Sequence, residues 1–241
     1  PTTPALTRWA GAFSGGYRDF YAADEALADL QEVDAMGDQT FRVRAFRQVG
    51  DSALRFRFKL YHRGGHLPLA DVTPILEHMG LRALIEDAFE LTPVGANGPE
   101  AVWVHEFLLE DRAGEHLVFA EVKDAFEELF TAVWTGKTES DGFNRLVLEL
   151  GVSWRDAALV RSLAKYRLQS GLDPSQSVQE QALSDNPGIA RLSLDMFRVK
   201  FDPAVKADVA ARQTQAEKVM EEIVAALQAV ASLDADRVLR R

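Results

Sequence analysis

The chain has 241 residues, of which 47% are hydrophobic and 27% are charged, so it has the composition of a globular protein with one large domain or two smaller ones. Acidic residues outnumber basic residues 37 to 27, and the formal charge of −10 argues against nonspecific nucleic-acid binding because it repels a phosphate backbone. The lack of cysteine excludes disulfides, thiolate metal ligands and cysteine nucleophiles.

The sequence shows no sign of export or membrane insertion. Its apolar runs are too short to cross a bilayer, and residues 1–16 lack the basic, apolar and small-residue pattern of a secretion signal. We therefore expect a cytoplasmic protein that does not bind membranes. Because the first residue is proline, we also expect either processing or a segment of something longer.

The N-terminal third predicts one helix and two strands. Residues 24–36 have the pattern of a lead-in helix. Apolar and polar residues alternate in residues 41–45 and again in residues 54–60, so the two runs are expected to pair as a hairpin. One side of that hairpin is basic, and we interpret it as a solvated sheet face; it carries Arg42, Arg44, Arg55, Arg57 and Lys59.

The next stretch predicts a short helix between the second strand and a third. Val72, Ile75, Leu76 and Met79 have helical spacing. Asp71 is expected as the N-cap, Pro74 within the first turn, and Gly80 after the last turn. Residues 81–91 and the run "AVWVHEFLL" then predict strands, and a long amphipathic helix is expected from Phe119.

This order of elements predicts an α+β fold. From Leu54 onward it reads strand, helix, strand, strand, helix, which is the start of a ferredoxin-like antiparallel sheet with helices on one face. The strand at Phe41 would join that sheet as an extra strand. We expect a lead-in helical segment in residues 1–37, the α+β domain in 38–138 and an all-α helical region in 139–241.

The all-α region is expected to end in a long helix. Ser153 and Asp156 predict a capping box for an earlier helix, and Asp202 followed by Pro203 predicts the start of the last one. The last helix would carry an apolar stripe of Val205, Val209, Ala216, Val219, Ile223 and Val230. That stripe packs either on its own neighbours, or on a partner chain, or on the rest of a longer protein.

No complete active site is recognisable. The glycine pattern of dinucleotide-binding folds and the P-loop are both absent, and the histidines at 62, 66, 78, 105 and 116 never form H-E-x-x-H. His105 and Glu106 would point to opposite faces of a strand. We therefore predict no catalytic, cofactor-binding or metal-binding residue in this chain.

The glycine loop at residues 64–67 is the candidate binding site. Gly64 and Gly65 allow a close backbone approach, and the helix that follows presents N–H groups suited to a carboxylate. Such glycines are also ordinary turn residues, so the residues alone leave both interpretations open.

The sequence resembles two related patterns. The run "GHLPLADVTPILEHMGLRALIE" resembles the core of an ACT domain. Together with "VWVHEFLLE", "WTGKTESDGFNRLVLELGVSWRDAALVRSLAKYRLQSG", "NPGIARL" and "SLDADRVLRR", it is similar from about Tyr17 to Arg241 to the large bacterial NAD-specific glutamate dehydrogenases. The resemblance implies that residues 38–138 are an ACT-like domain N-terminal to the catalytic domain. It also implies that Gly64, Gly65, His66 and Leu67 could bind an amino-acid effector.

Three hypotheses follow. In the first, the chain is a non-catalytic regulatory and oligomerisation segment of such an enzyme. By resemblance, the whole protein would convert L-glutamate and NAD to 2-oxoglutarate, ammonia and NADH as a homo-oligomer, while this segment alone holds no NAD and is inactive. In the second, the chain is a stand-alone amino-acid-sensing ACT module. In the third, which has the weakest support because no acid-base or nucleophile set is complete, it is an autonomous enzyme.

Overall fold

The computed structural model describes residues 7–95, 98–114, 118–172 and 175–240. Contacts divide the chain into two compact units, one made of residues 1–77 and 81–119 and the other of residues 78–80 and 120–241. No helix in the described ranges is long and apolar enough to cross a membrane.

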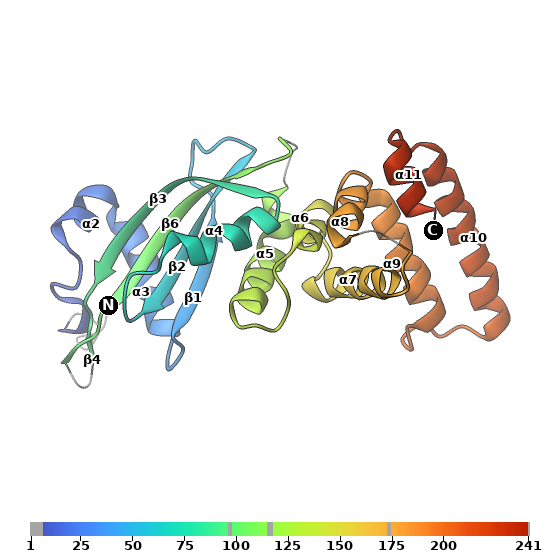
Figure 1. Cartoon of the computed structure of the whole chain (residues 1–241). Helices are drawn as coiled ribbons and strands as arrows, with labels where there is room; N and C mark the ends of the chain where they lie inside the picture. The colour runs from blue at the N-terminus through green and yellow to red at the C-terminus, as the bar shows by residue number, and fades with distance from the viewer. Residues whose placement is uncertain (1–6, 96–97, 115–117, 173–174, 241) are drawn as a thin grey trace. The chain divides into compact units, whose positions relative to one another are not determined.

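The first unit is built on an antiparallel four-stranded sheet in the order β1-β2-β6-β3 (Figure 1). The hairpin of β1 with β2 confirms the predicted pairing, with Val43 opposite Leu60. A second, two-stranded sheet lies in the connection from β3 to β6. The strands are β1 (Phe41–Phe46), β2 (Arg55–Arg63), β3 (Leu81–Leu91), β6 (Val102–Asp111), and the short β4 (Val94–Gly95) and β5 (Gly98–Pro99).

The extra strand at Phe41 completes the sheet. A β-α-β-β-α-β unit ends with a strand after its second helix. Here the described part of the chain continues from α5 (Phe119–Trp134) into further helices, and β1 supplies the fourth strand by pairing with the free edge of β2. The predicted α+β class, with an antiparallel sheet followed by a helical region, is confirmed.

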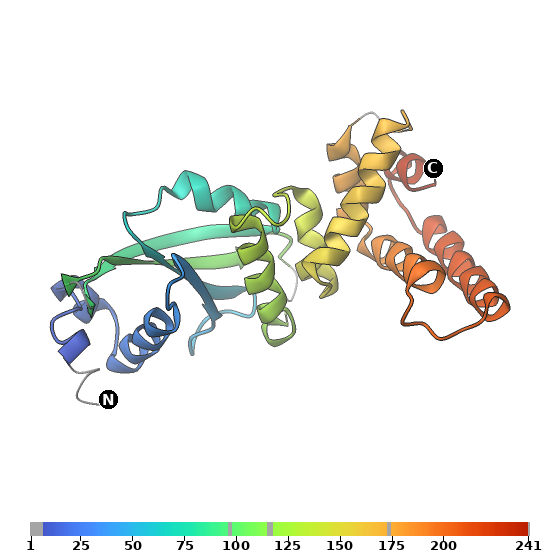
Figure 2. The ribbon, with the colours of Figure 1, turned by 90° about the horizontal axis from the view of Figure 1, so that it is seen from below.

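Helices lie on both sides of this sheet. Figure 2 shows α4 (Leu69–His78) on one side and α3 (Ala23–Ala35) on the other. The strands alternate, so Leu60, His105 and Phe107 share the face toward α4, whereas Lys59, Tyr61 and Glu106 share the face toward α3. The lead-in helix was predicted correctly from residues 24–36, and the structure adds its position against the sheet.

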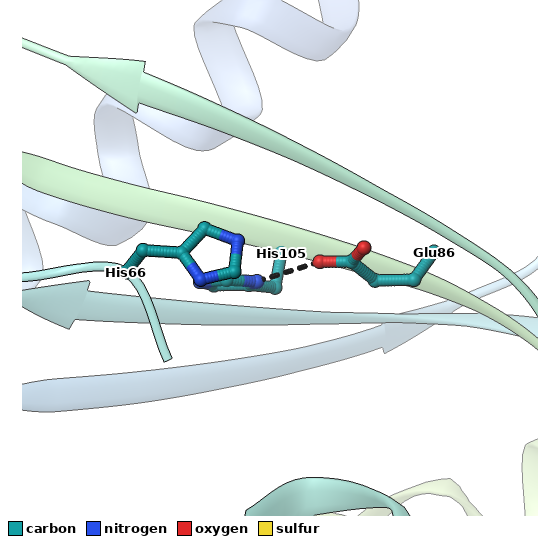
Figure 3. A group of neighbouring side chains, drawn as sticks. All are labelled: His66, Glu86 and His105. Carbon is teal, nitrogen blue, oxygen red and sulfur yellow. Dashed lines mark hydrogen bonds and ion pairs between the residues drawn. The ribbon is translucent and has the colours of Figure 1, made fainter. Parts of the chain in front are cut away.

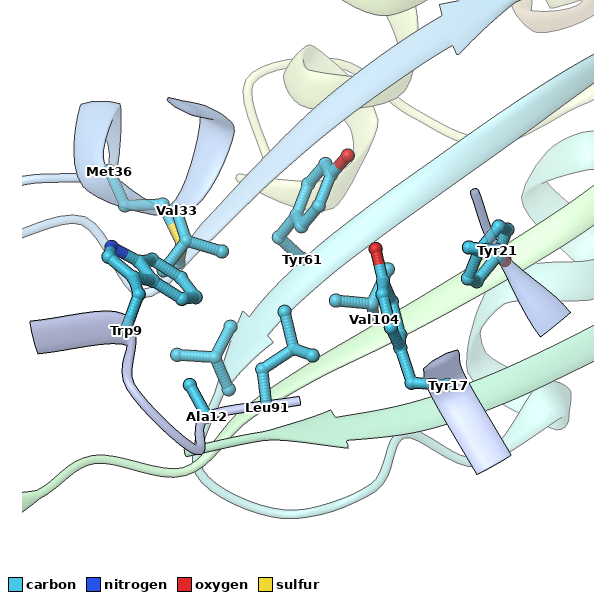
Figure 4. Close-up of a cluster of buried hydrophobic side chains, with 10 residues drawn as sticks. Trp9, Ala12, Tyr17, Tyr21, Val33, Met36, Tyr61, Leu91 and Val104 are labelled. Carbon is cyan, nitrogen blue, oxygen red and sulfur yellow. The ribbon is translucent and has the colours of Figure 1, made fainter. Parts of the chain in front are cut away.

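A hydrophobic cluster fixes the lead-in segment to the sheet (Figure 4). Tyr17, from α2 (Gly15–Phe20), and Tyr21 pack at the centre of an aromatic row with ring centroids 4.8 Å apart. Large buried aromatic side chains of this kind supply much of the free energy that holds such a contact. The cluster consists of Trp9, Ala12, Tyr17, Tyr21, Val33, Met36, Tyr61, Leu91, Val102 and Val104.

The basic strand face is not solvated where α3 covers it, and our interpretation of it was wrong for Lys59 and Arg44. The ammonium group of Lys59 is fully buried, 2.7 Å from Asp29 Oδ2 and 2.6 Å from Glu25 Oε1. Arg44 Nη1 lies 2.7 Å from the same Glu25 oxygen. The acidic residues of α3 therefore neutralise the cations that the strands present.

Asp29 is the centre of this network. Besides Lys59, the hydroxyls of Tyr17 and Tyr61 each donate to its carboxylate at 2.6 Å. Burial raises the pKa of Asp29 against the opposing effect of Lys59. Burial also acts to raise the pKa of Glu25, but hydrogen bonds from Arg44 and Lys59 outweigh it and leave that pKa below its usual value. The network joins a helix to a sheet through buried, paired charges.

The short helix α4 begins earlier than the sequence suggested. Its first residue is Leu69, so Asp71 lies in the first turn rather than at the N-cap, and Pro74 lies inside the helix. The Asp71 N–H donates to the Pro68 carbonyl at 3.0 Å, which extends the turn upstream of the apolar positions. Gly80 follows the helix with a φ of +83°, a conformation that favours glycine.

All regular elements in the described residues of the second unit are helices, which agrees with the predicted helical region. Ser153 and Asp156 form the expected capping box at the start of α7. Arg161 is buried and donates to Asp141 at 2.6 Å, which fixes α7 to the turn before η1. The elements are α5, η1 (Gly142–Asn144), α6 (Arg145–Leu150), α7 (Trp154–Gln169), α8 (Gln176–Ser184), α9 (Pro187–Phe201), α10 (Val209–Gln228) and α11 (Leu233–Leu239).

The predicted start of the last long helix was wrong. Pro203 lies in the connection from α9 to α10, and α10 begins at Val209 with Asp208 as its N-cap. The Asp208 side chain accepts from the Ala211 N–H at 2.8 Å. The Arg212 guanidinium holds the preceding turn by donating to the carbonyls of Val199 and Asp202 at 2.7 and 2.8 Å.

The apolar stripe of α10 is only partly covered. Ala216 is buried, Val219 and Ile223 are half-buried, and Val209 is 85% exposed. Val205 and Val230 lie outside the helix. The stripe contacts its own neighbour in part, because α10 packs against α9.

Candidate functional site

The predicted binding loop connects β2 to α4. Gly64 has a φ of +107°, a conformation that only glycine adopts without strain, and its N–H donates to the Ala101 carbonyl at 3.4 Å. Gly65 has ordinary backbone geometry, and a Cβ there would meet no atom within 4 Å. Gly64 therefore shapes the turn, whereas Gly65 leaves space beside the loop.

The two residues after the glycines face the sheet. His66 is exposed, and its ring meets those of Trp103 and His105 edge-on, with centroids 5.0 and 4.6 Å apart. Leu67 is buried, and its N–H donates to Nε2 of His105 at 3.3 Å. The loop is thus attached to β6 through one histidine.

His105 is the central group of the site, and it is only 1% exposed. Since Nε2 accepts from the Leu67 N–H, the ring proton is assigned to Nδ1, which lies 2.8 Å from Glu86 Oε1 on β3 (Figure 3). Burial lowers the pKa of His105, the neighbouring His66 and His62 act in the same direction, and Glu86 opposes them. The ring is therefore neutral and held in one tautomer.

The loop has a second tie, to the end of β2. Nδ1 of His62 lies 3.2 Å from the Gly65 carbonyl oxygen, and His62 pairs with Trp103 across β2 and β6. His62, Trp103 and His105 stand on the same face of the sheet, below the loop. The arrangement joins exposed imidazole, buried imidazole, carboxylate and indole within one small region.

The sequence identified only half of this site. Gly64, Gly65, His66 and Leu67 are together because they are consecutive, but His62, Glu86, Trp103 and His105 were not assigned to it. His105 and Glu106 do point to opposite faces, as predicted: His105 contacts Glu86, while Glu106 accepts from Arg57 at 2.7 Å. Only the strand register could have shown these contacts. It places His105 between Leu60 on β2 and Ala88 on β3, and the sequence does not specify that pairing.

The chemistry that this group offers is recognition of a ligand or an ion. His66, Glu86 and His105 present nitrogen and oxygen atoms that lie within 4.8 Å of one another. Of the other histidines, Nδ1 of His78 lies 2.9 Å from Ser140 Oγ, and His116 lies outside the described residues.

Comparison with protein-family models gives three matches along the chain. Residues 2–36 match glutamate dehydrogenase helical motif 2, residues 40–122 match the glutamate dehydrogenase ACT3 domain, and residues 138–203 match glutamate dehydrogenase helical motif 3. The candidate loop and its partners on β3 and β6 all lie within the ACT3 match.

Curated relatives that match nearly the whole chain are all named NAD-specific glutamate dehydrogenase. The chain is 30% identical over 237 residues to the NAD-specific glutamate dehydrogenase of Halomonas elongata, which covers 98% of this chain and 14% of that protein. Identity is 33% over 240 residues with the protein of that name from Pseudomonas aeruginosa, covering 99% of this chain and 15% of the relative. Identity to the protein of that name from Mycobacterium tuberculosis is 29% over 238 residues, covering 96% of this chain and 14% of the relative. The chain thus spans about a seventh of the length of these relatives.

Proposed function

Because this chain belongs to the family of large NAD-specific glutamate dehydrogenases, we propose that it is a non-catalytic segment that regulates the longer enzyme and helps it to assemble. The longer protein would convert L-glutamate and NAD to 2-oxoglutarate, ammonia and NADH in the cytoplasm. Its catalytic and NAD-binding residues would lie elsewhere in the polypeptide.

The main support for this proposal is that the matched parts of the family are helical motifs and an ACT domain. The matches describe two helical motifs and an ACT domain, in the order that the fold shows. The buried network of Lys59 and Asp29 joins the first helical motif to the ACT sheet. Such a joint lets a change at the sheet reach the helices, which is what a regulatory segment needs.

We place the regulatory site at the loop of Gly64, Gly65, His66 and Leu67, with a free amino acid as its effector. The open space beside Gly65 and the exposed ring of His66 support access from solvent. The link from Leu67 to His105 supports transmission to the sheet, because a ligand that moves the loop also moves a buried contact.

Thermal unfolding of the chain with single amino acids, 2-oxoglutarate and NAD tests this site. A ligand at a hundred times its Kd stabilises the native state by about 2.7 kcal/mol, which raises the Tm by several degrees. We expect one amino acid to raise the Tm and NAD to leave it unchanged. If no amino acid raises the Tm, the effector site is refuted and only the assembly role remains.

The variant Gly65→Val makes the test specific. A side chain at Gly65 fills open space without strain, so the fold is retained while the ligand is blocked. Gly188→Val is the matched control, since its Cβ also meets no atom within 4 Å and it lies in α9. The expected result is loss of the ligand-induced Tm shift in the first variant and its full retention in the second.

A further inference from the structure

Three side chains of the kinds that bind metals meet beside the glycine loop, although their spacing in the sequence matches no metal-binding motif. His66 comes from the loop, Glu86 from β3 and His105 from β6, and one ligand atom from each lies within 4.8 Å of the other two (Figure 3). All three belong to the first unit, so the sheet itself determines how Glu86 and His105 are placed.

We propose that His66, His105 and Glu86 bind a divalent first-row transition-metal ion such as Zn²⁺. Two imidazoles and a carboxylate are a donor set that Zn²⁺ takes at about 2.0–2.2 Å, and three protein ligands leave one position open to solvent or a small ligand. This inference concerns the ion alone and does not depend on the amino-acid effector.

The separations of the donor atoms suit such an ion after a small movement. Ligands about 2.0–2.1 Å from a tetrahedral ion lie about 3.3 Å from one another. His105 Nδ1 and Glu86 Oε1 are already 2.8 Å apart, so they need only to separate slightly. The remaining adjustment falls on His66, which is exposed and follows two glycines.

Binding at Nδ1 of His105 has a consequence for the loop. The ion replaces the proton that Nδ1 now directs to Glu86, and the neutral ring then carries its one proton on Nε2. Nε2 would face the Leu67 N–H, which now donates to it at 3.3 Å. Two donors cannot share that contact, so Leu67 must turn away when the ion binds. The site thus couples an ion to the position of the loop.

Calorimetric titration of the chelator-treated chain with Zn²⁺ alone tests the proposal. We expect one ion per chain, and we expect His66→Ala and Glu86→Gln each to weaken binding by about tenfold or more, because loss even of an outer partner has that effect. His66 is exposed, so its replacement keeps the fold. His78→Ala is the matched control, and its affinity should equal that of the unchanged chain.

Two further readouts identify the ligands and the coupling. Bound Co²⁺ should show the visible absorption of a tetrahedral site in the unchanged chain and lose it in His66→Ala. On adding Zn²⁺, the amide resonance of Leu67 should shift, while that of Ala211 at the cap of α10 should not. No uptake of Zn²⁺, or equal uptake by the unchanged chain and by His66→Ala, would overturn the proposal.

Discussion

Lys59 shows how one residue can be misjudged from its neighbours in the sequence. It alternates with Phe58 and Leu60 and therefore looked like one of several cations on a solvated strand face, yet its side chain is fully buried. A buried ammonium group is tolerated because Asp29 and Glu25 lie within 2.7 Å of it. These acids are about thirty residues away in the sequence, so the strand pattern held no information about them.

Removing that cation should be costly. Lys59→Met leaves the buried carboxylate of Asp29 and the half-buried carboxylate of Glu25 short of a partner, and we expect the free energy of unfolding to fall by about 3–5 kcal/mol in urea titration. Lys165→Met is the control, because Lys165 pairs with Glu139 on the surface, where such a pair contributes about 0–1 kcal/mol. Equal losses in the two variants would show that the buried network does not stabilise the first unit.

At the scale of elements, local signals worked best where the side chain acts on its own backbone. Ser153 and Asp156 were identified as a capping box, and the structure has both of its hydrogen bonds. Asp202 and Pro203 predicted a helix start equally well, but the chain there forms a turn held by Arg212. The helix begins only after Asp208, which is its N-cap. Asp202 instead lies at the C-cap of α9, where its N–H donates to the Arg198 carbonyl.

The capping box predicts a pH-dependent loss. Burial acts to raise the pKa of Asp156, but hydrogen bonds from Ser153 and the nearby Arg198 leave it below its usual value. The folded carboxylate therefore stabilises the protein above its unfolded pKa of about 3.9, and this stabilisation disappears as the pH falls through the lower folded pKa. Asp156→Ala should lower the free energy of unfolding at neutral pH by about 1 kcal/mol, and by clearly less at about pH 3.

Urea titrations at both pH values measure this difference. Asp195→Ala is the control, since the part-buried contact of Asp195 with Arg198 is long, at 3.5 Å. A difference between the unchanged chain and Asp156→Ala that stays constant from neutral to acid pH would contradict the assignment.

The corrected start of α10 can be checked in the same way. Asp208→Ala should destabilise the first turn of α10 by about 1 kcal/mol, because the Ala211 N–H loses its acceptor. Pro203→Ala should leave that turn unchanged. Hydrogen exchange of the amides in residues 209–215 distinguishes the two, and faster exchange only in the Pro203 variant would restore the original placement.

At the scale of the whole molecule, the chain carries an ACT3 domain and two helical motifs of a longer enzyme, and we propose that it needs the rest of that polypeptide for catalysis. We predict that the purified chain with L-glutamate and NAD forms no NADH beyond a protein-free control. A full-length relative measured in parallel shows that the assay works. Glutamate-dependent NADH formation by the chain alone would contradict the non-catalytic proposal.

The sequence by itself determined the α+β class, the four strands of the main sheet, several helices, the glycine loop and the family. These follow from periodicity, caps and glycine geometry, which act over a few residues, and from long motifs that need no structure to recognise. Only the tertiary structure decided that α3 buries Lys59, and that His66, Glu86 and His105 meet. The physical reason is that strand register and the packing of a helix on a sheet join residues tens of positions apart, which local patterns do not encode.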